Sequence, residues 1–444
     1  MTIERDIERL FLEWKNSPDR KPLLLQGARQ IGKTWTMVNF GKAHYPHCVK
    51  FDFDRMPELR EVFQKTKQPD RLIKELATYC EAPLLPGETL IIFDEIQECE
   101  EALNSLKYFY EEAPQYHIMA AGSLLGVAVR HRSMAVPVGK VHMVRMYPVT
   151  FPEFLRAADR SVYDYVDSIQ EIGHLPTIVL NKLLLEYKRY QVCGGMPEAV
   201  VAMLSDRGMA AVDDTLQDIL DLYELDFAKY AVPQEIPRVR AIWHSLPAQL
   251  SKENRKFIYR VVKESARSKD YEDALLWLED AGMVYRVQNI SKPGIPLSGY
   301  ADSKAFKVYA CDCGLLRRMA LVSSDVIMNG NAGYTEFKGA LAENVVLQSL
   351  VAEKEVEYPY YWTSGNEAEI EFVAQVQDMI IPLEVKAERS VGGKSLSIYD
   401  NRYNPPYRVR FSSNNLQCNG NLLSIPSPLA GWLPRFLHLQ NNAV

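Results

Sequence analysis

The sequence predicts a multidomain α/β protein whose first domain is a P-loop NTPase domain built on a parallel sheet. A short apolar strand at residues 22–26 runs directly into the motif Gly-Ala-Arg-Gln-Ile-Gly-Lys-Thr at residues 27–34, and a helical pattern follows. A second apolar strand at residues 89–93 ends in Asp94 and Glu95, a run typical of buried parallel strands. The chain has 444 residues, which is too long for one hydrophobic core, so several domains are expected.

The spacing of the first motif explains how it would hold a nucleotide with Mg²⁺. Gly27 and Gly32 allow backbone conformations that a Cβ atom would block, so backbone N–H groups can surround the phosphates at the start of a helix. Lys33 is expected to reach the β- and γ-phosphates, and the Thr34 hydroxyl is expected to bind Mg²⁺. The expected nucleotide-binding residues are Gly27, Ala28, Arg29, Gln30, Ile31, Gly32, Lys33, Thr34, Trp35 and Asp94.

The second strand predicts hydrolysis as well as binding. Asp94 can hold the metal together with Thr34, and Glu95 can orient or deprotonate the attacking water. A third strand at residues 117–121 ends in Gly-Ser, so the Ser123 hydroxyl is a candidate contact for the γ-phosphate or the water, although this dipeptide is also an ordinary turn. The expected catalytic residues are Lys33, Glu95 and Ser123. The cation that offsets transition-state charge is left open among Arg130, Arg132, Lys140 and Arg145.

The middle of the chain predicts a helical connector at 161–235, after a first domain at 1–160, and then a winged-helix-like domain at 236–325. Three helical stretches followed by a strand suggest the winged helix. Its third helix carries Lys269 against five acidic residues, a pattern that phosphate would repel. A basic stretch that includes Lys252, Arg255, Lys256 and Arg260 lies one helix earlier. Nucleic-acid binding and protein packing both remain open for this segment.

The last segment, 326–444, predicts a helix that contains Glu343, a β-meander, a further helix and a strand. Glu371 lies on the second strand of the meander, while Glu384 and Lys386 share a face of the third. Two carboxylates, Glu371 and Glu384, can hold Mg²⁺, with Glu343 completing the metal shell. Lys386 can position a hydroxide. This arrangement resembles restriction-endonuclease-like nucleases of the PD-(D/E)xK type, in which Asp is preferred at the position of Glu371.

Composition limits the partners and the compartment. The formal net charge is -6, so contact with nucleic acid requires a local basic patch. Seven scattered cysteines without a Cys-x-x-Cys pair indicate reduced thiols in a cytoplasmic protein. The charged residues at 4–9 are unlike a signal peptide, and no uncharged run is long and apolar enough to cross a membrane. Nothing in the sequence indicates an oligomeric state.

Several motifs together resemble one prokaryotic AAA family whose members carry a C-terminal half of unknown function. They are the P-loop, Phe-Asp-Glu-Ile-Gln at 93–97, Ala-Gly-Ser at 121–123, Tyr-Pro-Val-Thr-Phe at 147–151, Gly-Gly-Met-Pro-Glu at 194–198, Asp-Cys-Gly-Leu-Leu at 312–316 and Gly-Ala-Leu-Ala-Glu at 339–343. A strand at 49–53 lies between the two nucleotide motifs, and an inserted strand with an adjacent Glu also resembles the AAA branch. The resemblance implies ATP rather than GTP and a winged helix. Family members usually carry Arg where this chain has Lys140.

Two functions follow from these patterns. The first is an ATPase coupled to nucleic-acid handling through the nuclease-like domain, because two sites for phosphate chemistry occur in one chain. The second is a nucleotide-dependent switch or scaffold that binds a protein partner and carries an inactive nuclease-like domain. The acidic third helix, Glu371 and the negative net charge favour this alternative.

Overall fold

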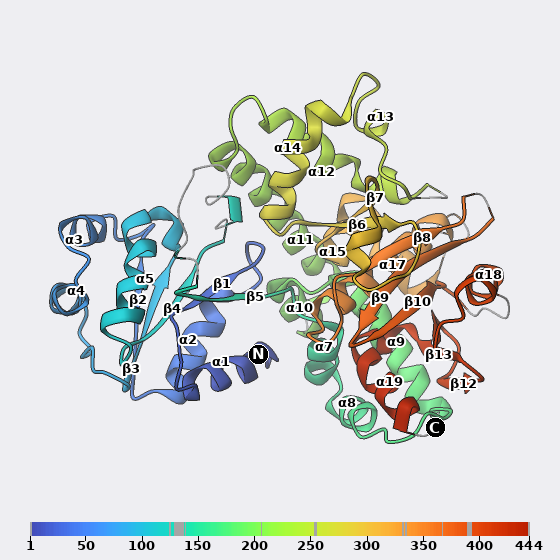
Figure 1. The fold of residues 1–444 in the computed structure, drawn as a ribbon, viewed down its shortest axis with the longest axis horizontal. Coiled ribbons are helices and arrows are strands. Elements are labelled where there is room, and N and C mark those ends of the chain that lie inside the picture. Colours follow the sequence, from blue (N-terminus) through green and yellow to red (C-terminus); the bar gives the residue numbers. More distant parts are fainter. Residues whose placement is uncertain are drawn as a thin grey trace. The chain divides into compact units, whose positions relative to one another are not determined.

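The computed structural model of the chain describes residues 2–442 apart from 124–125, 128–136, 138, 206, 253–254, 331–332, 334, 366 and 389–392. The chain divides into two compact units (Figure 1). The N-terminal unit contains residues 5–148 and 280–282, and the C-terminal unit contains residues 1–4, 149–279 and 283–444. Within the part of the chain that the structure describes, no helix is both long and apolar enough to cross a membrane.

The N-terminal unit is built on a parallel sheet of strands in the order β2-β3-β4-β1-β5. The sheet shows that the inserted strand of the AAA-like pattern is β4, which pairs with both motif strands, β1 and β3. The strand at 49–53, β2, lies at the edge, because the crossover connections of a parallel sheet separate chain order from spatial order. The strands are β1 (Leu23–Gln26), β2 (His47–Asp52), β3 (Thr89–Asp94), β4 (His117–Ala121) and β5 (His142–Arg145).

Helices cover both faces of this sheet. Ile91 and Phe93 of β3 belong to a buried cluster with the apolar side chains of α3, α4 and α5. On the other face, Leu90 contacts α2 beside Gly41, where an added Cβ would lie 3.0 Å from the leucine side chain. Alternate residues of a strand point to opposite faces, so a continuous apolar run is required for a sheet covered twice. The helices are α1 (Ile7–Asn16), α2 (Lys33–His44), α3 (Leu59–Lys65), α4 (Pro69–Leu76) and α5 (Glu100–Glu112).

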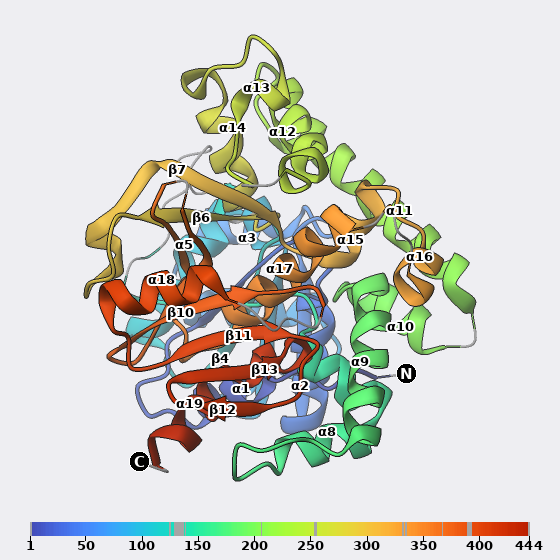
Figure 2. The ribbon, with the colours of Figure 1, turned by 90° about the vertical axis from the view of Figure 1, so that its right-hand side faces the viewer.

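The C-terminal unit contains an eight-stranded mixed sheet in the order β12-β13-β11-β10-β9-β8-β6-β7. Strands β10, β11 and β13 lie side by side in Figure 2. Since β6 pairs with β8, the hairpin of the expected winged helix and the strands of the expected nuclease-like domain belong to one sheet. The strands are β6 (Val284–Ile290), β7 (Ala301–Ala310), β8 (Tyr360–Thr363), β9 (Glu369–Val376), β10 (Met379–Val385), β11 (Arg408–Ser412), β12 (Gln417–Asn419) and β13 (Leu422–Pro426).

This shared sheet explains why the structure shows no division at the expected boundary of 325, and the two units meet in the chain at 148–149 rather than at the expected boundary of 160. The expected element order of the last segment is present as α17, β8, β9, β10, α18 and β11. The remaining helices are α7 (Phe151–Ala158), α8 (Arg160–Asp167), α9 (Thr177–Cys193), α10 (Pro197–Leu204), α11 (Gly208–Tyr230), α12 (Ile236–Leu250), α13 (Tyr259–Val262), α14 (Ser268–Asp280), α15 (Cys313–Met319), α16 (Ser324–Asn329), α17 (Thr335–Ala352), α18 (Lys394–Tyr403) and α19 (Leu433–Asn442).

Candidate functional sites

The backbone of residues 27–34 has the conformation that the glycine spacing predicts. Gly27, Gln30 and Gly32 have φ values of 149°, 62° and 89°, in the region that glycine tolerates best. An added Cβ on Gly27 would lie 2.3 Å from the Met146 carbonyl oxygen, so only glycine fits between the loop and the chain after β5. Strand β1 therefore ends in a tight loop that leads into the N-terminus of α2.

Lys33 lies inside this loop. Its ammonium donates hydrogen bonds to the carbonyl oxygens of Gly27, at 2.9 Å, and Ala28, at 2.7 Å. Burial lowers the pKa of Lys33 to about 8, although the nearby carboxylates of Glu95 and Asp94 favour its charged form. The positive charge is thus held where the loop would enclose phosphate groups.

Thr34 and Asp94 meet at the carboxyl end of the sheet. The Thr34 hydroxyl donates to Asp94 Oδ1 at 2.9 Å. Burial raises the pKa of Asp94, against the hydrogen bond from Thr34 and the positive charge of Lys50. A hydroxyl and a carboxylate side by side form the oxygen donor set that Mg²⁺ prefers, so these two residues fit the expected metal.

Glu95 is held in a fixed orientation beside this pair. Its backbone is left-handed, with a φ of 50°. Ser123 Oγ donates to Glu95 Oε1 at 2.9 Å, and Gln97 Nε2 donates to Oε2 at 2.5 Å. Ser123 therefore lies against the carboxylate that is expected to act on water. Gln97 was not among the expected site residues, although it follows Glu95 in the Phe-Asp-Glu-Ile-Gln motif.

Two of the candidate cations, Lys140 and Arg145, lie at opposite ends of β5. Lys140 precedes β5, pairs with Glu111 at 2.8 Å and lies at the amino end of that strand. Arg145 ends β5 in register with Gln26, the residue before the P-loop, and it is exposed. The P-loop follows the carboxyl end of β1 and β5 runs parallel to β1, so Arg145 is the better placed of the two. Arg130 and Arg132 lie outside the described residues.

The other expected nucleotide-binding residues lie in the loop itself and at the start of α2. Ile31 is fully buried and Ala28 is nearly so, and these side chains anchor the loop in the core. Arg29 and Gln30 are partly exposed. Trp35 is 44% exposed at the start of α2, so its indole ring is accessible to solvent rather than part of the core.

Two basic side chains near the loop, those of Arg5 and Lys50, were not predicted from the sequence. Arg5 is buried and donates to the Ile31 carbonyl at 3.0 Å and the Tyr147 carbonyl at 2.7 Å, so it ties the P-loop to the chain after β5. Lys50 lies 2.9 Å from Asp52 and 3.5 Å from Asp94 across the ends of β2 and β3. Neither Arg5 nor Lys50 belongs to a recognisable local motif. Only the register of β2 against β3 indicates that Lys50 lies near Asp94.

In the C-terminal unit, the structure gathers the acids and the lysine that were expected to form a site. Glu343 lies on α17, Glu371 on β9 and Glu384 on β10, and Lys386 follows β10 directly. Lys386 Nζ lies 3.4 Å from Glu384 and 3.8 Å from Glu371. Burial and the like charge of Glu343 raise the pKa of Glu371 to about 7, although Lys386 opposes this shift.

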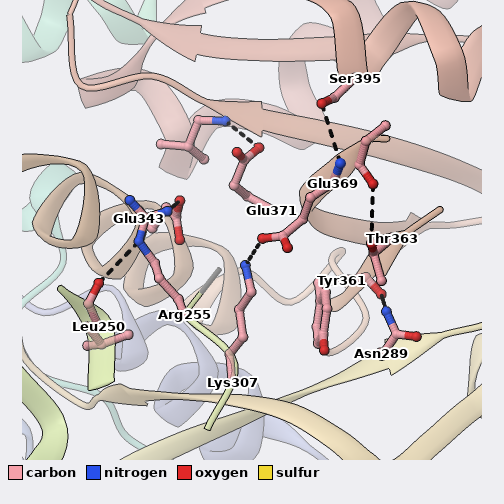
Figure 3. A network of polar contacts seen from close by, with 12 residues as sticks. Leu250, Arg255, Asn289, Lys307, Glu343, Tyr361, Thr363, Glu369, Glu371 and Ser395 are labelled. Carbon is pink, nitrogen blue, oxygen red and sulfur yellow. Dashed lines mark hydrogen bonds and ion pairs between the residues drawn. The ribbon is translucent and has the colours of Figure 1, made fainter. Parts of the chain in front are cut away.

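Cations from elsewhere in the unit already engage these carboxylates. Figure 3 shows Arg255 reaching Glu343 and Lys307 reaching Glu369. Tyr309 donates to the second oxygen of Glu343 at 2.9 Å. The Lys307 ammonium, which is completely buried, lies 2.5 Å from Glu369. Both Arg255 and Lys307 come from residues before α17, outside the predicted nuclease-like segment.

The remaining carboxylate oxygens are engaged in the same way. Arg410 Nε donates to Glu384 Oε2 at 2.7 Å, and the backbone N–H of Val385 donates to Glu371 Oε2 at 3.2 Å. Together with Arg255, Tyr309 and Lys386, these donors contact both oxygens of each of the three expected metal-binding glutamates. Four acids face four cations: Glu343, Glu369, Glu371 and Glu384 against Arg255, Lys307, Lys386 and Arg410.

This arrangement does not fit the expected Mg²⁺ at Glu371 and Glu384. A divalent ion requires carboxylate oxygens that face it, whereas these oxygens face internal cations and donors. Within the described ranges, no group of three or more His, Cys, Asp or Glu side chains is placed to hold a metal ion. The charge balance of the cluster is supplied by the chain itself.

The helix expected to repel nucleic acid is partly neutralised. Arg286 of β6 lies 2.7 Å from both Glu272 and Glu279 of α14. Arg255, counted in the basic stretch before α14, turns its guanidinium to Glu343 instead. The acidic character of α14 and the basic character of the preceding stretch are both smaller than the sequence indicates.

Comparisons with known proteins identify the N-terminal part of the chain. Residues 19–155 match a family described as an AAA domain, so this region is an AAA-type domain with the fold of P-loop ATPases. Residues 184–326 and 338–429 match two families described as domains of unknown function, DUF8612 and DUF4143. No curated protein sequence matches the chain.

Three solved structures illustrate the structural similarities. A Walker-type ATPase of Pyrococcus abyssi is 16% identical with a TM-score of 0.42, covering 72% of this chain and 96% of that one. The ORC2 protein of Aeropyrum pernix is 14% identical with a TM-score of 0.36, covering 73% and 92%. The RuvB Holliday junction branch migration motor of Thermotoga maritima is 15% identical with a TM-score of 0.26, covering 64% and 90%.

Proposed function

We propose that this chain binds ATP with Mg²⁺ at residues 27–35 and hydrolyses it. The observation that carries the proposal is the orientation of Glu95, whose two carboxylate oxygens accept hydrogen bonds from Ser123 and Gln97. These two donors fix the direction in which the Glu95 carboxylate points. Lys33 and Thr34 of the P-loop lie in the same unit as Glu95, and Thr34 donates to Asp94.

Each residue has a separate role in this proposal. Mg²⁺, when bound with the nucleotide, neutralises phosphate charge. Thr34 and Asp94 hold its ligand sphere, and Lys33 exchanges its carbonyl partners for phosphate oxygens. Glu95 orients the attacking water and accepts its proton, while Ser123 and Gln97 keep the carboxylate in place.

The test separates binding from hydrolysis. We expect Lys33→Ala to lose binding of a fluorescent ATP analogue, and Glu95→Gln to bind it while hydrolysis falls by about 10²-fold or more. Glu88→Gln, an exposed acid just before β3, is the matched control and leaves both unchanged. Hydrolysis by Glu95→Gln at the wild-type rate would exclude Glu95 as the base.

We further propose that the C-terminal unit links this ATPase to nucleic acid. The order α17, β8, β9, β10, α18 and β11 is that of the nuclease-like core, and the four residues expected for its site converge. The helices α12, α13 and α14 with the hairpin β6–β7 support a winged-helix-like segment next to it. The seven free cysteines support a reducing, cytoplasmic compartment.

The second candidate is a nucleotide-dependent switch that binds a protein partner and leaves the nuclease-like site inactive. The engagement of Glu343 by Arg255 and of Glu384 by Arg410 favours it. ATPase rates with and without DNA or RNA distinguish the two functions: stimulation supports nucleic-acid coupling, and an unchanged rate supports the switch. Incubation with plasmid and linear DNA in Mg²⁺ or Mn²⁺, with Glu384→Ala and Lys386→Ala as controls, tests cleavage at this site.

A further inference from the structure

We propose that the turn Asp280–Gly282, which joins α14 to β6, is a positioning element of the nucleotide site and supports the P-loop from its outer side. These three residues belong to the N-terminal unit, whereas Glu279 before them and Met283 after them belong to the C-terminal unit. Nucleotide affinity therefore depends on a segment that lies far from the nucleotide motifs in the chain. This inference rests on the proposed binding of ATP at residues 27–35 and adds an element to that site.

Helix α14 ends at this turn in a way that its sequence explains. Gly282 has a φ of 71°, in the left-handed region that glycine adopts without strain. The Met283 N–H donates to the Leu278 carbonyl at 2.9 Å, the hydrogen bond that closes a helix end around a left-handed glycine. The Cys311 N–H donates to the Met283 carbonyl at 2.9 Å and ties the chain after the turn to the end of β7. The shape of the turn is therefore set by its own hydrogen bonds.

Gly282 packs directly against the first residues of the P-loop. A Cβ added to Gly282 would lie 3.1 Å from the backbone nitrogen of Ala28 and 3.6 Å from both the Ala28 Cα and the Gly27 carbonyl carbon. The two backbones can approach this closely because position 282 has no side chain. The neighbouring Ala281 is buried, so the turn is not an exposed loop.

The contact lies on the outer side of the P-loop. Lys33, inside the loop, donates to the carbonyl oxygens of Gly27 and Ala28, so these oxygens point inward, where phosphate is expected. In a trans peptide the N–H points away from the C=O, so the Ala28 N–H points away from Lys33. Because the Ala28 nitrogen is the atom nearest to the added Cβ, Gly282 supports the loop and leaves its phosphate side open.

A second close approach holds the other side of the turn. A Cβ added to Gly126 would lie 2.5 Å from the Asp280 carbonyl oxygen. Gly126 lies shortly after Ser123, whose hydroxyl orients Glu95. The turn thus contacts the P-loop and the chain after β4, two segments that contribute residues to the proposed site.

Hydrogen exchange in the full-length chain without nucleotide tests the contact, and titration with a fluorescent ATP analogue tests its consequence. We expect Gly282→Ala to speed amide exchange of the peptide that covers residues 27–34, measured by mass spectrometry, because the loop loses its support. The affinity for the analogue should fall roughly tenfold or more, since a displacement of about 1 Å can cost about 100-fold in a preorganised site. Gly126→Ala displaces the turn from the opposite side and should give the same two changes.

Glycines with open surroundings provide matched controls. Gly87 has a φ of 72° and nothing lies within 4 Å of a Cβ added to it, so Gly87→Ala carries the same backbone strain without the contact. Gly173→Ala is the control for Gly126→Ala, because position 173 is also open and neither glycine has a left-handed φ. Gly126→Ala leaves the cap of α14 unchanged, so it tests the contact even if Gly282→Ala unfolds. Far-UV circular dichroism and the thermal unfolding midpoint establish which variants are folded.

Three results would overturn the inference. The two variants could match their controls in loop exchange, or exchange could rise while the affinity for the analogue stays unchanged. Tighter binding by either variant would mean that the turn obstructs the nucleotide site. A wild-type chain that does not bind the analogue would instead refute the proposed ATP site, and the exchange measurement would still decide whether the turn supports the loop.

Discussion

Replacing Arg5 by Ala should loosen the P-loop without touching a residue of the nucleotide motifs. The guanidinium donates to the carbonyl oxygens of Ile31 and Tyr147, at 3.0 Å and 2.7 Å, from a buried position. Hydrogen bonds from charged groups contribute about 1.5–3 kcal/mol each, so losing two should lower the free energy of unfolding by roughly 3–6 kcal/mol. The affinity for nucleotide should fall as well, because Ile31 lies within the loop that is proposed to surround the phosphates.

Urea unfolding followed by circular dichroism measures the stability, and titration with a fluorescent ATP analogue measures the affinity. Arg9→Ala is the matched control, because Arg9 is an exposed arginine of α1 and its loss should change stability by no more than about 0.5 kcal/mol. The reasoning is refuted if the two variants unfold at the same urea concentration and bind the analogue equally well.

Three further predictions concern other parts of the structure. His117 accepts or donates a hydrogen bond at 2.6 Å to Tyr45, and burial lowers its pKa to about 4, so the neutral imidazole stabilises the fold. This contribution is complete above the unfolded pKa of about 6.5 and is lost as pH falls toward 4, a change of up to about 3 kcal/mol in thermal or urea unfolding. In steady-state ATPase assays, Arg145→Ala should lower kcat by about tenfold or more, whereas Lys140→Ala should leave it within about twofold. Asp312→Ala should lower the free energy of unfolding by about 2–6 kcal/mol, because the buried carboxylate accepts from two backbone N–H groups at 2.6 Å and 2.9 Å.

Each of these predictions has a contrary outcome. A His117→Gln variant with the same acid sensitivity as wild type would show that another group causes the loss of stability. If Lys140→Ala lowered kcat more than Arg145→Ala did, the cation that offsets transition-state charge would lie at the amino end of β5, contrary to this prediction. Wild-type stability of Asp312→Ala would mean that water replaces the carboxylate at the backbone of residues 195 and 315.

The proposed nucleotide site could be located from the sequence because its residues lie in two short, continuous segments. Gly27, Lys33 and Thr34 occupy one loop whose geometry follows from glycine spacing between a strand and a helix. Asp94 and Glu95 end a strand whose apolar run indicates burial on both faces. Such local patterns fix backbone conformation over a few residues, so the sequence alone predicted the backbone of the loop and which side chains are candidates to meet a phosphate.

Contacts between distant segments could not be predicted in this way. Arg5 meets Tyr147 across 142 residues, and Arg255 meets Glu343 across 88, without any local pattern that pairs them. The inserted strand proved to be β4 because sheet order depends on packing rather than on chain order.

The sequence by itself therefore determined the AAA-type domain, its phosphate loop and the acids and lysine that gather in the C-terminal unit. Only the tertiary structure decided that Gln97 and Ser123 orient Glu95 and that internal cations engage the C-terminal carboxylates. The reason is physical: residue type and spacing set local conformation, whereas the charge environment of a side chain depends on every segment that folds against it.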